Sequence, residues 1–205
     1  MSLNLKLTTK NKVFFLKIVI HLLAILPLIN LYIAAFNDQL GADPVEAVIH
    51  FTGIGALNLL LITLAVSPIS KQFKWAYLLQ TRRLLGLYVF TYAFFHLVNF
   101  LAFEVQFDMS LFFEEIIERP YITIGLVAFM LLLALAVTSI KAIKRKMGKG
   151  WQTLHNFNYL IILLVAIHFY WSVKSDITEP LIYWVITLFL LRFRFGKFKR
   201  WFSHK

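Results

Sequence analysis

The chain contains no cysteine among its 205 residues. Disulfide bonds, thiolate zinc sites, cysteine-ligated iron–sulfur clusters and thiol nucleophiles are therefore excluded, so a redox centre would need histidine, methionine, tyrosine or carboxylate ligands. Charged residues are also scarce, at 15% of the chain against about 25% in soluble domains. With 60% hydrophobic residues and a mean hydropathy of +0.75, the composition indicates a membrane protein.

Six apolar runs are long enough to cross a bilayer as helices, which takes about 20 residues each. They cover residues 13–36, 44–66, 84–107, 120–140, 153–173 and 180–195. The first run lacks the small-residue cleavage site of a signal peptide, so we expect it to stay in the mature chain. The sequence therefore predicts an all-α membrane protein, a six-transmembrane-helix bundle over residues 13–195. An N-terminal arm (1–12), a short interfacial helix (108–119) and a basic tail (196–205) complete this expectation.

Charge gives the expected orientation of the bundle. All but two of the 21 basic residues lie in the N-terminal arm, the second and fourth loops, the tail and the helix ends that adjoin them. The remaining three loops, with the adjoining helix ends, hold all 10 acidic residues. Because basic residues accumulate on the cytoplasmic side, the pattern predicts that both termini are cytoplasmic. The net charge of +11 follows from this insertion and does not indicate nucleic acid binding.

Prolines mark three expected helix starts on the outer side. Pro44, Pro120 and Pro180 each precede an apolar run, and proline suits the first helical position because no hydrogen bond is lost there. Asp43 and Glu179 stand directly before two of these prolines. We expect their side chains to cap the helices.

Five histidines lie within or at the edge of the apolar runs: His21, His50, His96, His155 and His168. Ionisable residues inside a membrane are costly, so they are functional candidates. At about 1.5 Å per residue, His96 and His168 lie roughly 18 and 21 Å from the inner edge. This common level suits two ligands of one haem iron, for which neutral imidazole is an established ligand. His155 lies about 20 Å from His168 on one expected helix, a distance that suits two stacked haems.

Several of these residues have an alternative, structural interpretation. A single histidine in a span often hydrogen-bonds a neighbouring helix, and this alternative is favoured for His50 and still more for His21. Arg82 and Arg83 can anchor the chain at the inner surface, or bind haem propionates or a flavin phosphate in bidentate fashion. Trp151 and the basic run 141–149 can act as an interfacial anchor or as a docking site for a cytoplasmic reductase.

Long ordered motifs carry a resemblance to a known family. They are GADPVEAVIHFTG (41–53), TRRLLGL (81–87), RPYITIG (119–125), GKGWQTLHNFNYL (148–160) and IHFYWSVK (167–174). Over about residues 12–195 the chain resembles the MsrQ (formerly YedZ) family of the ferric-reductase-like transmembrane superfamily. The resemblance implies the haem-binding inner-membrane subunit of a periplasmic methionine sulfoxide reductase system.

The resemblance also implies cofactors and partners. Electrons would come from a cytoplasmic flavin reductase or from quinol. They would pass through one or two b-type haems, with FMN and quinone as further cofactor candidates, to the periplasmic molybdopterin enzyme MsrP. The family's haem histidines correspond to His96, His155 and His168. Where the wider superfamily has a second histidine 13–14 residues before the one in the third helix, this chain has Arg82 and Arg83, which leaves the inner haem's second ligand unassigned.

Three functions compete at this stage. A transmembrane electron conduit needs the helix 3 and helix 5 histidines and no substrate chemistry of its own. A histidine-relay transporter typically shows inverted repeats and mid-membrane charges, but no acid lies deep in a run and no internal repeat is evident. A stand-alone ferric or quinone reductase would normally carry a flavin and nicotinamide domain, and no Gly-rich dinucleotide motif is present. We therefore predict the conduit.

Overall fold

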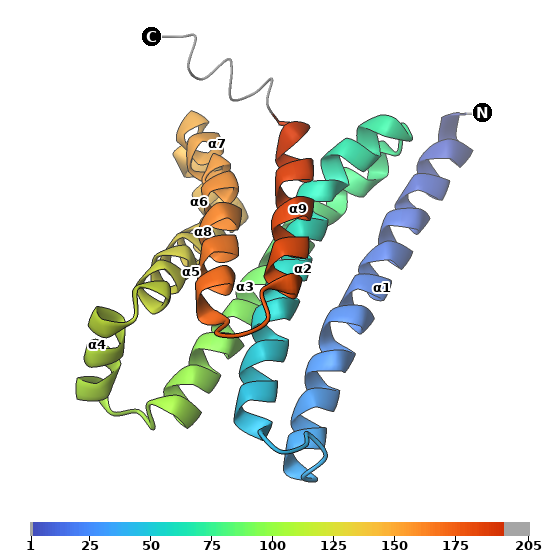
Figure 1. The fold of residues 1–205 in the computed structure, drawn as a ribbon. Helices are drawn as coiled ribbons and strands as arrows, with labels where there is room; N and C mark the ends of the chain where they lie inside the picture. The colour runs from blue at the N-terminus through green and yellow to red at the C-terminus, as the bar shows by residue number, and fades with distance from the viewer. Residues whose placement is uncertain (1, 195–205) are drawn as a thin grey trace. The chain divides into compact units, whose positions relative to one another are not determined.

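A computed structural model describes residues 2–194, with side chains from residue 8 onward. Every regular element in that part of the chain is helical. These are α1 (Ser2–Phe36), α2 (Pro44–Gln72), η1 (Ala76–Thr81), α3 (Arg82–Asn99), η2 (Phe100–Glu104), α4 (Met109–Glu118), α5 (Pro120–Thr138), α6 (Lys141–Met147), α7 (Lys149–Asn156), α8 (Asn158–Ser172) and α9 (Thr178–Arg192) (Figure 1). The all-α prediction is confirmed for these residues, and the expected tail (196–205) lies outside them. The chain divides into two compact units, Met1–Phe112 and Phe113–Lys205.

Five helical stretches are long and apolar enough to cross a membrane. They are Thr8–Phe36, Pro44–Gln72, Ala76–Glu104, Pro120–Thr138 and Lys149–Ser172. The sixth expected span corresponds to α9, which has 15 residues. That length gives a rise of about 22 Å, short of a hydrocarbon core of about 30 Å. The described residues thus confirm five of the six expected spans by length and composition.

Helix boundaries differ from the sequence prediction at three places. The chain from Ser2 already belongs to α1, because the expected arm contains no glycine or proline that would break a helix. α2 continues to Gln72 with Pro68 inside it, six residues beyond the predicted end. The expected helix 153–173 is not continuous, because it is interrupted at Phe157, whose N–H bonds the carbonyl of Leu154 in a tight turn.

The predicted position of proline at the first residue of a helix is observed for two of the three prolines. Pro44 and Pro120 are the first residues of α2 and α5. The Asp43 carboxylate accepts a hydrogen bond from the Glu46 amide at 2.8 Å, as expected of a capping residue. The expected interfacial helix forms as α4, and Asp108 accepts hydrogen bonds from its first amides.

The start of α9 corrects the third prediction. α9 begins at Thr178, so Glu179 and Pro180 both lie inside its first turn. Asp176, rather than Glu179, accepts the hydrogen bond from the Thr178 amide, at 2.9 Å. Hydrogen bonds from the side chain and backbone of Thr178 lower the pKa of the Asp176 carboxyl. An ionised carboxylate at this position also complements the positive end of the helix dipole.

In the first unit, α2 and α3 form an antiparallel pair with α1 alongside (Figure 1). Leu57 and Leu60 of α2 are almost fully buried. Tyrosine hydrogen bonds add polar links between helices: the Tyr92 hydroxyl donates to the Ala24 carbonyl at 2.7 Å, and His21 pairs with Tyr88. Such polar links matter in lipid, where apolar packing alone provides little drive for helix association. His21 therefore has a helix-packing contact.

In the second unit, α5 packs on α8 and α8 packs on α9. Ile161 and Ile162 of α8 have no exposed surface. The buried residues of α5 are Ala128, Leu132 and Leu135, whose spacing places them on one face of that helix. The packed pair of α5 and α8 brings together the candidate functional side chains of this unit.

Candidate functional site

His96 lies on α3 and its ring rests against α2. Its Nδ1 atom is 2.9 Å from the carbonyl oxygen of Ile49. A carbonyl oxygen can only accept a hydrogen bond, so Nδ1 carries the proton and donates it. Nε2 is then the basic ring nitrogen, the one able to coordinate a metal. Gly53 lies one turn after Ile49, and a Cβ atom there would stand 3.0 Å from the His96 ring.

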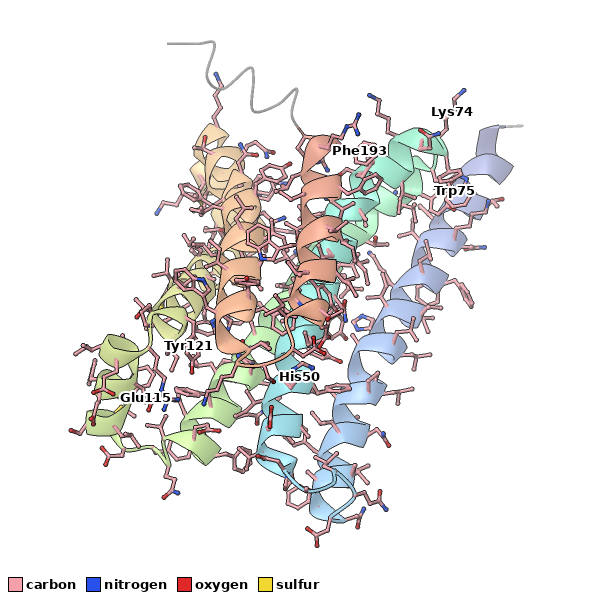
Figure 2. The ribbon with its side chains drawn as sticks, in the orientation of Figure 1. His50, Lys74, Trp75, Glu115, Tyr121 and Phe193 are labelled. Carbon is pink, nitrogen blue, oxygen red and sulfur yellow. The ribbon has the colours of Figure 1, made fainter. Side chains whose placement is uncertain are left out.

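His168 repeats this arrangement in the second unit. Its Nδ1 lies 2.7 Å from the carbonyl oxygen of Tyr121, near the start of α5 (Figure 2). Here too the carbonyl requires a protonated Nδ1 and leaves Nε2 as the coordinating nitrogen. Gly125 lies one turn after Tyr121, and a Cβ atom there would stand 2.7 Å from the His168 Nδ1 atom.

The two arrangements share one spacing along the chain. Each histidine follows the residue whose carbonyl it contacts by 47 positions, and each glycine follows that residue by one helical turn. The same local arrangement thus occurs once in each unit. The glycines were not among the predicted site residues, although both end motifs that were singled out, HFTG and ITIG. Their role becomes visible only when the histidine ring is seen on the facing helix.

His155 differs from the other two histidines. Its Nε2 atom lies 3.1 Å from the Thr138 hydroxyl. The same hydroxyl lies 2.7 Å from the Ala134 carbonyl, to which it can donate. Nε2 of His155 thus contacts a side-chain hydroxyl, whereas in His96 and His168 it is Nδ1 that contacts a backbone carbonyl. Coordination of a metal by this Nε2 would require the ring to leave Thr138.

Trp151 is part of the same cluster at the end of α5. Its ring stacks on His155 with centroids 4.0 Å apart, and its Nε1 atom donates to the Thr138 carbonyl at 3.0 Å. The Lys144 ammonium group of α6 lies 4.0 Å above the same ring, a cation–π contact. Trp151 thus connects α5, α6 and α7, which is more than the interfacial anchoring that the sequence suggested.

The remaining predicted site residues lie apart from these contacts. His50 is the neighbour of Ile49 on α2, and its side chain is exposed (Figure 2). Arg82 and Arg83 form the first turn of α3 and are exposed. Arg83 precedes His96 by the same 13 positions by which His155 precedes His168. By this spacing, Arg83 in the first unit corresponds to His155 in the second.

The donor chemistry of these sites suits a haem better than a bare metal ion. Among residues 2–194, no group of three or more histidine, cysteine or acidic side chains converges in a way that could hold a metal ion. A haem iron takes its equatorial ligands from the porphyrin and needs only axial groups such as imidazole from the protein. Two histidines held by backbone carbonyls, each against a glycine that leaves room for the ring, meet that requirement.

Comparison with known proteins agrees with this chemistry. Residues 51–166 match the family described as ferric reductase like transmembrane component. The chain is 44% identical to the protein-methionine-sulfoxide reductase heme-binding subunit MsrQ of Cronobacter sakazakii, over 94% of this chain and 97% of that protein. The subunits of the same name from Salmonella arizonae and Salmonella gallinarum are 43% and 44% identical, over 94% of this chain and 98% of each relative. The similarity thus extends over nearly the whole chain.

Proposed function

The chain belongs to the ferric-reductase-like transmembrane family and, within it, to the MsrQ proteins, and on this basis we propose that it is a haem-binding electron-transfer subunit of a methionine sulfoxide reductase system. The observation that carries this proposal is the pair of histidines whose Nδ1 protons are held by backbone carbonyls, at 2.9 and 2.7 Å. Such a contact fixes the tautomer and the ring orientation of a metal-ligating histidine.

In this proposal His96 and His168 each supply an axial imidazole to b-type haem. When bound, haem supplies one-electron redox chemistry. The chain's own residues set where that chemistry occurs: the carbonyls of Ile49 and Tyr121 orient the rings, and the glycines admit them. His155 would serve a second, inner haem after its ring leaves Thr138. Arg82 and Arg83 would hold propionates or a flavin phosphate, because guanidinium groups bind such anions bidentately.

We further propose a six-span topology with both termini in the cytoplasm of a bacterial inner membrane, in which α9 forms the sixth span. The distribution of basic and acidic residues supports this orientation. Electrons would enter from a cytoplasmic flavin reductase or from quinol, with FMN and quinone as the accompanying cofactors. They would leave to the periplasmic molybdopterin enzyme MsrP, so the chain would need no substrate chemistry of its own.

The orientation can be tested directly because the chain has no cysteine. Gln72 at the end of α2 and Ser110 in α4 are both exposed, so Gln72→Cys and Ser110→Cys each introduce one unique thiol. We expect a membrane-impermeant maleimide to label Ser110→Cys in intact spheroplasts and Gln72→Cys only after the membrane is opened. The wild-type chain is the unlabelled control. The opposite labelling pattern would reverse the proposed direction of electron flow.

Haem binding can be tested on the purified chain from haem-replete cells. We expect a Soret band and α-bands that sharpen on reduction, because axial imidazoles give a low-spin haem. Pyridine haemochromogen analysis of the same sample counts the haems per chain, and acid extraction shows whether flavin is present. The His21→Ala variant is a matched control, because His21 is a span histidine with a helix-packing contact to Tyr88. A colourless wild-type preparation would contradict the proposal.

A further inference from the structure

We infer that Gly53 and Gly125 are positioning residues, each of which lets a histidine lie flat on a helix and point its coordinating nitrogen away from that helix. The inference rests on the proposed haem function and goes beyond it, because it assigns the orientation of the ligands to two residues that are not ligands themselves. It would explain why a pair of glycines recurs at the same place in both halves of the chain.

The first argument is space. A Cβ atom on Gly53 would lie 3.0 Å from Cε1 and 3.1 Å from Nδ1 of His96. A Cβ atom on Gly125 would lie 2.7 Å from Nδ1 and 2.8 Å from Cε1 of His168. Non-bonded carbon atoms prefer separations of about 3.5–4.0 Å. At Gly125 the ring and a methyl group therefore cannot occupy these places together, and at Gly53 the ring would have to move by a few tenths of an ångström.

The second argument is the hydrogen bond. In an α-helix the carbonyl of residue i accepts from the amide of residue i+4, so the carbonyls of Ile49 and Tyr121 face the amides of Gly53 and Gly125. Each imidazole reaches the same oxygen from outside the helix, and its path passes over the glycine. A side chain at that position would push Nδ1 away from the carbonyl. The glycine is thus needed both for the hydrogen bond between Nδ1 and the carbonyl and for the close packing of the ring on the helix.

The third argument is contrast with the other helical glycines. At Gly86 on α3 and Gly150 on α7, a Cβ atom would have no neighbouring atom within 4 Å. Gly55, two residues after Gly53, faces the Tyr92 ring rather than a histidine. Close packing against an imidazole is therefore a property of Gly53 and Gly125 and not of helical glycines in general. Gly55, Gly86 and Gly150 supply matched controls.

The experiment compares alanine variants at all five positions. Gly53→Ala and Gly125→Ala are expected to weaken haem binding by about 10- to 100-fold, the usual cost of losing a partner that orients a metal ligand. The readouts are haemin titration, the position of the reduced α-band, and the midpoint potential. Gly86→Ala and Gly150→Ala should match the wild type in all three. Gly55→Ala forces the Tyr92 ring to move. This variant therefore measures how much haem binding changes when α2 and α3 are pushed apart without a collision with a histidine.

Thermal unfolding tests the same glycine–histidine contact without haem. It gives a clear result even if an alanine variant folds poorly. If the methyl group at position 125 collides with the His168 ring, then the double variant Gly125→Ala/His168→Ala removes the collision. Its thermal unfolding temperature should be at least that of His168→Ala, since alanine is the better helix former, whereas Gly125→Ala alone should be lower than the wild type. The corresponding cycle applies to Gly53→Ala and His96→Ala. Such non-additivity is expected only of residues in contact.

The outcomes separate this inference from the proposed function. If Gly53→Ala and Gly125→Ala bind haem as tightly as the wild type does, the inference is overturned and the proposed function stays intact. An equal loss in Gly55→Ala would also overturn it, because helix separation would then explain the effect. Additive unfolding temperatures in the double-variant cycles would do the same. A wild-type chain that binds no haem would instead refute the function, while the cycles would still report on the glycine–histidine contact.

Discussion

Alanine at position 168 is expected to abolish a low-spin haem signal, and alanine at position 96 is expected to do the same. Each substitution removes an imidazole whose Nδ1 is already fixed by a backbone carbonyl, at 2.7 Å for His168 and 2.9 Å for His96. Optical and electron paramagnetic resonance spectra of purified variants measure the effect, together with the haem content of each preparation.

Two further histidine variants make the result specific. His50→Ala removes an exposed imidazole from α2, one residue from the carbonyl that holds His96. A wild-type spectrum in this variant would remove His50 from the ligand set, and a changed one would support the ligand role predicted from the sequence. His155→Ala should leave the haem held by His96 or His168 in place. Unaltered spectra in both His96→Ala and His168→Ala would refute the ligand assignment.

Alanine at position 151 is expected to lower the free energy of unfolding by about 2 kcal/mol. A fully buried tryptophan costs about 3–5 kcal/mol when truncated, and the partial exposure of Trp151 reduces this range. The substitution removes the stack on His155, the hydrogen bond to the Thr138 carbonyl and the Lys144 contact together. For a chain of this length we expect a decrease of roughly 4–8 °C in Tm, measured by circular dichroism in detergent.

Two controls separate the contributions of that ring. Trp151→Phe keeps an aromatic surface against His155 but loses the Nε1 hydrogen bond, so its Tm should lie between those of alanine and wild type. Trp171 is 53% exposed, and Trp171→Ala should change the stability by less than about 0.5 kcal/mol. Equal losses in Trp151→Ala and Trp171→Ala would show that the cluster around His155 contributes no stability of its own.

The helical class and five of the spans were predictable because long apolar runs have few alternatives in a membrane. The cap at Asp43 was predictable because aspartate before proline is a local signal. The cap at the start of α9 was not, since Asp176 and Glu179 offer the same carboxylate chemistry and only the backbone geometry decides between them. The interruption at Phe157 had no strong sequence signal either, because neither glycine nor proline stands there.

The site shows the same division between local and non-local information. Imidazole within an apolar run is rare and costly, so His96, His155 and His168 could be identified as candidates from the sequence. The glycines could not, because each meets its histidine across two helices and many intervening residues. The contact of His155 with the Thr138 hydroxyl was equally hidden, since it joins two side chains that lie 17 positions apart in the sequence. Geometry, rather than composition, distinguishes this histidine from the other two.

The glycine contacts have a consequence for how the protein can change over time. Glycine is the smallest residue, so every amino-acid replacement at position 53 or 125 adds at least one carbon atom next to a ring that already lies at contact distance. Neither position has a mild substitution, whereas a leucine in the core can become isoleucine or methionine at modest cost. Compensation would have to come from the facing histidine, and therefore from the proposed haem ligand itself. At Gly53 and Gly125 a hydrogen atom stands where any other residue has a Cβ atom. Keeping that hydrogen atom restricts which substitutions each half of the chain can accept.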